Sequence, residues 1–215
     1  MCPLVGKDIN TFVESEGEYV RHLKGMRCFC VANSKGQPEA GCKHCDGSGF
    51  IYRDENTIIG LVTAISHDKK MMDTGIFYPD DCIFSPLSTD TVSEMDKIIF
   101  SWPLPYGMGD PVVRGNDDSD DLFYEAVNGI YCTDENSVVY RENTDYRFKG
   151  KTIEWTWTGQ PAGSVKPSTG TRYVIKYKAY IEWIAFIPPV TRTSHSEDLG
   201  DKVILRKLHL MNKGS

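Results

Sequence analysis

The hydrophobic pattern has one helical stretch, near the N-terminus. Residues at helical spacing there are Phe12, Glu16, Tyr19, Val20 and Leu23. Asp8 is placed to cap a helix that begins beside it, and Gly25 follows the last of these positions. We therefore expect one amphipathic helix between Asp8 and Gly25. Gly17 inside it costs about 1 kcal/mol relative to alanine, so the helix needs packing to hold.

Beyond Phe50 the period changes, and short apolar runs separated by glycine and proline predict strands. Apolar and polar residues alternate over 172–183, which predicts one long, half-buried strand. Residues 153–158 alternate in the same way, and a connector rich in Gly, Pro and Ser links the two stretches. We expect them to pair as a long-loop hairpin. The shorter strands expected are 58–65, 81–85, 96–102, 111–114, 138–140, 145–148 and 202–210.

The most specific chemistry is a cluster of four of the seven cysteines, Cys28, Cys30, Cys42 and Cys45. Two close thiol pairs joined by a polar loop can converge on one tetrahedral ion, and four protein ligands leave no position for a substrate. Glycines after the second pair allow a tight knuckle. The residues thus predict a closed structural Zn²⁺ site, although the C-x-C arm is tighter than the common C-x2-C.

Other interpretations of the thiols stay open. Two disulfides would have to cross between the arms, because C-x-C cysteines bridge each other poorly. A redox or iron–sulfur site lacks the usual motif context, so zinc, iron and disulfides remain alternatives at this point. His44 could replace a thiol, but a solvated loop position is the simpler expectation. The three cysteines outside the cluster, Cys2, Cys82 and Cys132, are expected to be buried or incidental thiols. Whether any of them forms a disulfide between subunits is left open.

These patterns predict a mainly β fold, a β-barrel or β-sandwich with one N-terminal helix and a zinc-stapled loop. We expect the helix and cysteine loop in residues 1–52 and the β body in 53–190, as one module or as two that divide near 112. Residues 191–215 are expected to form an extended C-terminal arm and a strand, which by default joins its own sheet.

Composition excludes several functional classes. The net charge of −6 argues against nonspecific binding to nucleic acid, which needs clustered Lys and Arg. No apolar run is long enough to span a membrane and no secretory signal is visible, so we expect folding in a reducing cytoplasm.

Catalysis has no support in the sequence. No common catalytic or nucleotide-binding motif is present and the histidines are scattered, so we expect no enzyme. The acidic run 116–121 is a weak calcium candidate and reads more simply as a solvated loop. A carbohydrate-binding sandwich that uses Trp155, Trp157 or Tyr173 is a further alternative, although buried core aromatics explain the tryptophans better.

The order of these features resembles a group of tailed-bacteriophage virion proteins. The similarity spans roughly residues 20–210. It is carried by Cys28-x-Cys30, the following Gly-Gln-Pro, Cys42-x-x-Cys45-x-Gly-x-Gly-Phe-Ile-Tyr52, and by residues 58–63, 75–86, 96–100, 145–148, 153–155 and 199–209.

The resemblance implies a structural protein of the virion neck, a head-closure or head-to-tail connector protein that forms a ring with copies of itself. It further implies contacts with portal or connector and tail proteins, and passage of DNA through the lumen without sequence-specific binding. A baseplate or tail-tip protein is the alternative within this class, and a zinc-ribbon nucleic-acid-associated factor is the alternative outside it.

Overall fold

The computed structural model describes residues 6–33, 36–65, 80–194 and 197–211. It divides into two compact units: a barrel unit within Met1–Ser101 and Glu182–Ser215, and an inserted unit, Trp102–Ile181. Strands dominate both, so the prediction of a mainly β fold is confirmed. The boundaries differ from those expected. The expected domain boundaries after residues 52 and 190 would each cut through a paired strand. Composition along the chain does not reveal which strands pair, so it could not locate the boundaries.

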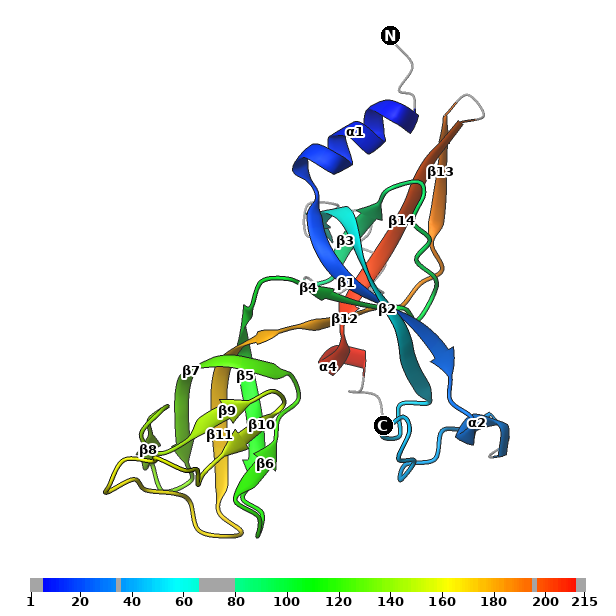
Figure 1. Cartoon of the computed structure of the whole chain (residues 1–215). Helices are drawn as coiled ribbons and strands as arrows, with labels where there is room; N and C mark the ends of the chain where they lie inside the picture. The colour runs from blue at the N-terminus through cyan, green and yellow to red at the C-terminus, as the bar shows by residue number, and fades with distance from the viewer. Residues whose placement is uncertain (1–5, 34–35, 66–79, 195–196, 212–215) are drawn as a thin grey trace. The chain divides into compact units, whose positions relative to one another are not determined.

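Six antiparallel strands form a closed barrel in the barrel unit (Figure 1). In order around the ring they are β12 (Glu182–Ala185), β4 (Lys97–Phe100), β1 (Glu18–Arg27), β2 (Phe50–Ala64), β3 (Cys82–Pro86) and β14 (Glu197–Lys207), which returns to β12. The core is apolar, with Val20, Phe84, Ile98, Ile184 and Leu205 all buried. The strands approach closely at Gly60, where a Cβ would lie 2.4 Å from the Phe84 ring.

The N-terminal helix is shorter than expected. Helix α1 (Gly6–Glu16) ends before Gly17, whose N–H donates to the Val13 carbonyl at 2.8 Å. The second half of the predicted helix is wrong: it is strand β1, because these residues pair with both β2 and β4. Pairing on two sides outweighs a helical period that only a few side chains support. Val13 is fully buried and anchors α1.

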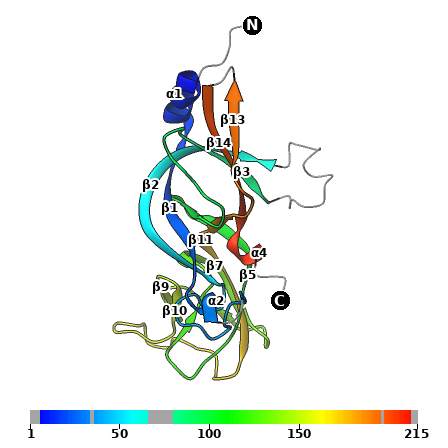
Figure 2. The same cartoon turned by 90° about the vertical axis from the view of Figure 1, so that its right-hand side faces the viewer.

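The C-terminal segment folds back on its own sheet. Strand β13 (Val190–Ser194) pairs with the first half of β14, and the second half of β14 lies in the barrel. The extended arm expected here is therefore one side of a hairpin, whereas the expected pairing with its own sheet is confirmed. This hairpin runs beside α1 (Figure 2). The chain continues into helix α4 (Leu208–Met211), which ends the strand expected over 202–210 at Lys207.

The inserted unit contains two sheets. One has the order β5 (Leu104–Val113), β11 (Arg172–Tyr180), β7 (Glu125–Asp134), β8 (Val139–Tyr140); the other has the order β6 (Ser119–Asp121), β10 (Thr152–Glu154), β9 (Arg147–Lys149). Edge-on ring contacts such as Trp155 with Tyr173, 5.1 Å between centroids, join buried side chains of this unit.

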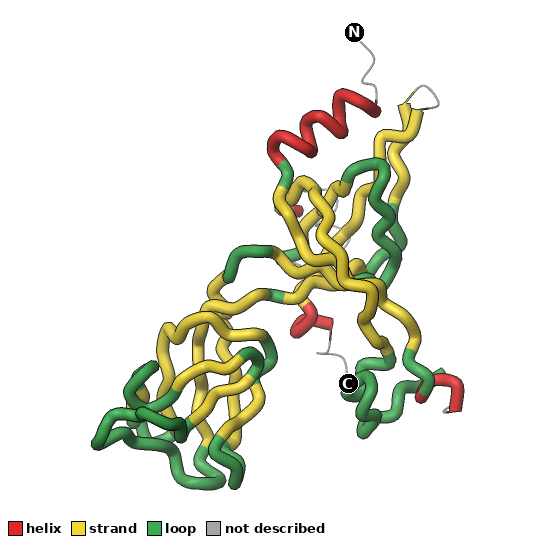
Figure 3. The backbone as a smooth tube through the Cα atoms, viewed as in Figure 1, coloured by secondary structure: helices red, strands yellow, loops and turns green. Residues whose placement is uncertain are grey.

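Two expectations for this region are wrong. The long strand over 172–183 is interrupted at Ile181, so that β11 belongs to the inserted unit and β12 to the barrel. The expected hairpin does not form, because β10 pairs with β6 and β9 while β11 pairs with β5 and β7. The connector between β10 and β11 is loop throughout, as expected (Figure 3). Alternation located β10 and β11 approximately, although residues 155–158 are loop. It carries no information on partners that come from far along the chain.

Candidate metal centre

The cysteines lie at the end of a two-stranded ribbon. Strand β4 pairs with β1 only over Val20–Leu23, and β3 pairs with β2 only over Gly60–Ala64. Beyond those residues β1 and β2 pair with each other as far as Arg27 and Phe50. The loop 28–49, with the short helix α2 (Cys30–Asn33), joins them. A two-stranded ribbon is marginal in water, so its end needs another source of stability.

The four sulfurs meet at one point. The Sγ atoms of Cys28, Cys30, Cys42 and Cys45 all lie within 4.8 Å of one another. The distance is 3.7 Å both between Cys28 and Cys42 and between Cys30 and Cys45. A tetrahedron with metal–sulfur bonds of about 2.3 Å has edges of about 3.8 Å, whereas a disulfide is about 2.05 Å long. The predicted convergence is confirmed, with spacing that suits a tetrahedral metal ion and with all four thiols free.

Backbone hydrogen bonds hold both arms of the cluster. The Cys28 N–H donates to the Gly49 carbonyl at 2.8 Å, which closes the ribbon directly above the last strand pair. In the second arm Asp46 N–H donates to Cys42 O at 2.9 Å and Ser48 N–H donates to Cys45 O at 2.8 Å. Gly47 has φ of 80°, and a Cβ there would lie 3.1 Å from the Ala40 carbonyl oxygen. This is the knuckle that the glycines predict.

The described residues of the loop bury few other side chains. The buried cluster at its centre consists of the four cysteines and Ile51, with Val31 packed against them. Two aliphatic side chains supply little hydrophobic stabilisation against the entropy of ordering a loop of this length. A ligand shared by the four sulfurs would supply the missing cross-link.

The thiols differ in acidity because of their hydrogen bonds. A backbone hydrogen bond from His44 lowers the pKa of Cys42 to about 7, despite burial. A backbone hydrogen bond at Glu39 lowers the pKa of Cys30, but burial and the neighbouring thiols outweigh it and raise this pKa to about 12. Of these two thiols, that of Cys42 is therefore the more easily deprotonated. A divalent cation would replace the thiol protons, which is the usual chemistry of a thiolate site.

Cys82, Cys132 and His44 are not part of the four-sulfur cluster. His44 is exposed, as expected for a solvated loop residue. Cys82 and Cys132 are buried, and burial raises the pKa of each thiol to about 12, so both are poor nucleophiles. Cys2 lies outside the described residues.

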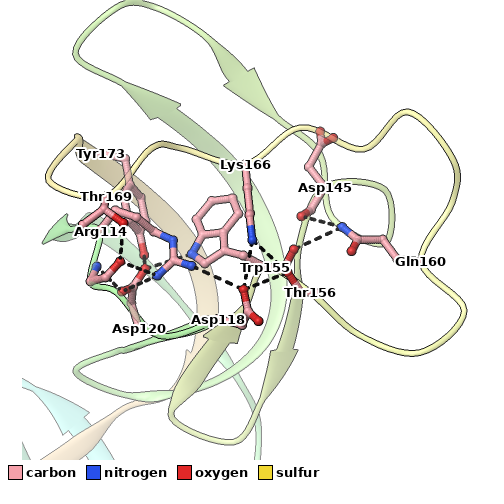
Figure 4. Close-up of polar contacts among 11 residues, drawn as sticks. Arg114, Asp118, Asp120, Asp145, Trp155, Thr156, Gln160, Lys166, Thr169 and Tyr173 are labelled. Atoms are coloured by element: carbon pink, nitrogen blue, oxygen red, sulfur yellow. Dashed lines mark hydrogen bonds and ion pairs between the residues drawn. The ribbon is translucent and has the colours of Figure 1, made fainter.

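The acidic run 116–121 is engaged within the inserted unit (Figure 4). Asp120 is buried and accepts hydrogen bonds from Trp155 Nε1 and the Tyr173 hydroxyl, both at 2.9 Å. Arg114 donates to the same carboxylate at 3.2 Å. Asp118 accepts from Lys166 Nζ at 3.0 Å. Trp155 and Tyr173 are therefore core residues whose polar atoms are occupied, which argues against a sugar platform built on them.

The barrel unit also contains buried pairs of polar side chains that the sequence did not predict. His22 Nε2 lies 2.8 Å from Asp96 Oδ2, and both side chains are buried. Arg206 makes two hydrogen bonds to Asp81, at 3.0 and 2.7 Å. Lys97 Nζ forms an ion pair with Glu182 Oε2. The partners are far apart in the sequence, so no local pattern could have revealed them.

No protein-family model matches the sequence, and no curated protein matches it significantly. Among the described residues, no helix is long and apolar enough to cross a membrane. A function for this chain is therefore inferred from its own residues and from the resemblance of its sequence motifs.

Proposed function

We propose that this protein is a non-enzymatic structural component of a tailed-phage virion. It forms a ring of identical copies in the neck, where it closes the head and joins it to the tail, next to portal or connector and tail proteins. The sequence resemblance is the main support. The closed barrel is compatible with this role, because closure removes the free sheet edges that would otherwise pair unspecifically.

The proposed metal is a structural Zn²⁺ held by Cys28, Cys30, Cys42 and Cys45. The observation that carries this part is the spacing of the four sulfurs, 3.7 Å between arms and within 4.8 Å throughout. Four thiolates complete a tetrahedral shell, so the ion would stabilise the loop and activate no water. The ion would fix the end of the β1–β2 ribbon as a rigid docking element.

The net charge of −6 also fits a DNA conduit. Phosphates crossing an acidic lumen are repelled from its wall, so the DNA would slide through without binding. A nucleic-acid-binding factor would instead be expected to carry an excess of Lys and Arg over Asp and Glu.

Metal analysis of the purified chain tests the proposed zinc site. We expect about one zinc per chain, lost in Cys28→Ser and in Cys45→Ser and retained in the matched control Cys82→Ser. Iron in place of zinc would correct the identity of the ion. An intact mass below that of the reduced chain by the hydrogens lost in forming two disulfides, with no metal bound, would refute the site.

Localisation tests the biological role. Mass spectrometry and immunogold labelling of purified virions should find the protein at the junction of head and tail. Labelling at the far end of the tail would favour the baseplate alternative. Absence from virions, together with binding to DNA at moderate salt, would overturn the proposal in favour of a nucleic-acid-associated factor.

A further inference from the structure

Phe29 is the most exposed large apolar side chain in the described part of the chain, at 69%. It lies between Cys28 and Cys30, whose Sγ atoms both face the cluster. The tight C-x-C spacing therefore directs the phenyl ring away from the loop interior. An exposed aromatic ring on a fixed loop has the form of a docking anchor.

The arm that carries Phe29 is cationic. Residues 24–30 include Lys24 and Arg27 and no carboxylate. Within the described residues neither side chain has an ion-pair partner. A complementary surface would combine an apolar hollow with negative charge.

The inserted unit offers such a hollow on the sheet β5–β11–β7. A pocket of about 360 Å³ is lined mainly by apolar groups, with Val113 and Val174 exposed at 61% and 39%. Asp134, Glu135 and Arg172 also line the pocket, which gives its lining two acidic residues and one basic residue. Hydrogen bonds from backbone amides and from Tyr140 outweigh burial and hold the pKa of Asp134 below its usual value, so this carboxylate is ionised at neutral pH.

We infer that Phe29 of one copy inserts into this pocket on the inserted unit of a second copy. The inference rests on the proposed ring and names the contact that builds it. The anchor and the pocket are different surfaces, so the contact is heterologous, and repetition of such a contact produces a ring when the rotation closes. Burial of the phenyl ring supplies affinity, and the positive arm against the net negative pocket favours this orientation.

Sedimentation of the zinc-loaded full chain tests the contact. Phe29→Ala and Val113→Lys alter the anchor and the pocket separately, and each should weaken self-association at least about tenfold. Phe12→Ala is the matched control, because Phe12 is 56% exposed on α1 and outside the contact. Zinc content and melting temperature verify that each variant folds.

A photo-cross-linker provides a second readout. Benzoylphenylalanine at position 29 should cross-link to a peptide around Val113 or Val174 of another copy, which mixing of isotope-labelled and unlabelled chains distinguishes from its own. If assemblies form but Phe29→Ala leaves them intact, or the cross-links lie elsewhere, the contact is wrong while the ring remains. If the wild-type chain stays monomeric up to millimolar concentration, the proposed ring is wrong as well.

Discussion

Glu182 pairs with Ile99 across neighbouring strands of the barrel, although the whole inserted unit lies between them in the sequence. Strands β4 and β12 are thus placed like the two arms of a hairpin, and Trp102–Ile181 occupies the position of its turn. The chain leaves and re-enters the barrel at adjacent points. Insertions tolerated by a fold are typically found at such positions.

The first prediction is that the inserted unit can be removed. Replacement of 102–181 by a short Gly- and Asn-containing turn should leave a folded barrel, because the β4–β12 register brings the two ends together. Circular dichroism and amide exchange would measure this. Loss of cooperative unfolding in the shortened chain would show that the barrel depends on the inserted unit.

The second prediction contrasts two adjacent aspartates. Asp81 is fully buried against Arg206, whereas the side chain of Asp80, which pairs with Lys207, is 64% exposed. Asp81→Ala removes the carboxylate that accepts two hydrogen bonds from the Arg206 guanidinium and should destabilise the barrel unit by about 3–5 kcal/mol. Asp80→Ala is the control and should cost less than about 1 kcal/mol. Equal losses in urea unfolding would contradict this assignment.

The third prediction concerns pH and Asp110, a buried carboxylate that accepts from the Tyr177 hydroxyl and the Phe123 N–H. Burial raises its pKa in the folded state despite these hydrogen bonds. The stabilisation of the folded state by the protonated Asp110 carboxyl group is therefore complete below the unfolded-state pKa of about 3.9. It is lost as pH rises through the folded-state pKa. Asp110→Asn removes this titration, so the inserted unit should become more stable relative to wild type at pH 7 than at pH 4.

Thermal unfolding at several pH values measures that difference. Asp118→Asn serves as its control, because a hydrogen bond from Lys166 lowers the pKa of this exposed carboxylate instead. An unchanged pH profile in Asp110→Asn would mean that Asp110 is solvated in the folded protein.

The fourth prediction concerns metal removal. Chelation should open the end of the β1–β2 ribbon and leave the barrel intact, because the cluster interior contains little besides sulfur. Hydrogen exchange should accelerate at the amides of Cys28, Asp46 and Ser48, which donate hydrogen bonds within the cysteine loop. Protection in the barrel, at Val20 for example, should persist. Unchanged exchange at Cys28 after complete removal of metal would indicate that the loop holds itself.

The candidate site was predictable because its determinants are local. Cys28 and Cys30 are neighbours in the sequence, Cys42 and Cys45 likewise, and the knuckle glycines follow directly. Some strand positions were also predictable, as in β11, where alternating burial follows alternating polarity. The strands β6 and β7 were not expected at all. By contrast, the helix expected through Leu23 ends at Glu16, because β1 gains two strand partners that local periodicity cannot reveal.

The sequence by itself therefore determined the β-rich character, the four metal-ligand candidates and the alternation of strand faces. Only the tertiary structure decided that β11 and β12 belong to different units and that β14 closes the barrel onto β12. It also decided the buried pairs of His22 with Asp96 and Arg206 with Asp81. The physical reason is the range of the interaction. Polarity and ligand spacing act between near neighbours, whereas strand pairing and buried charge depend on residues that meet only when the whole barrel has closed.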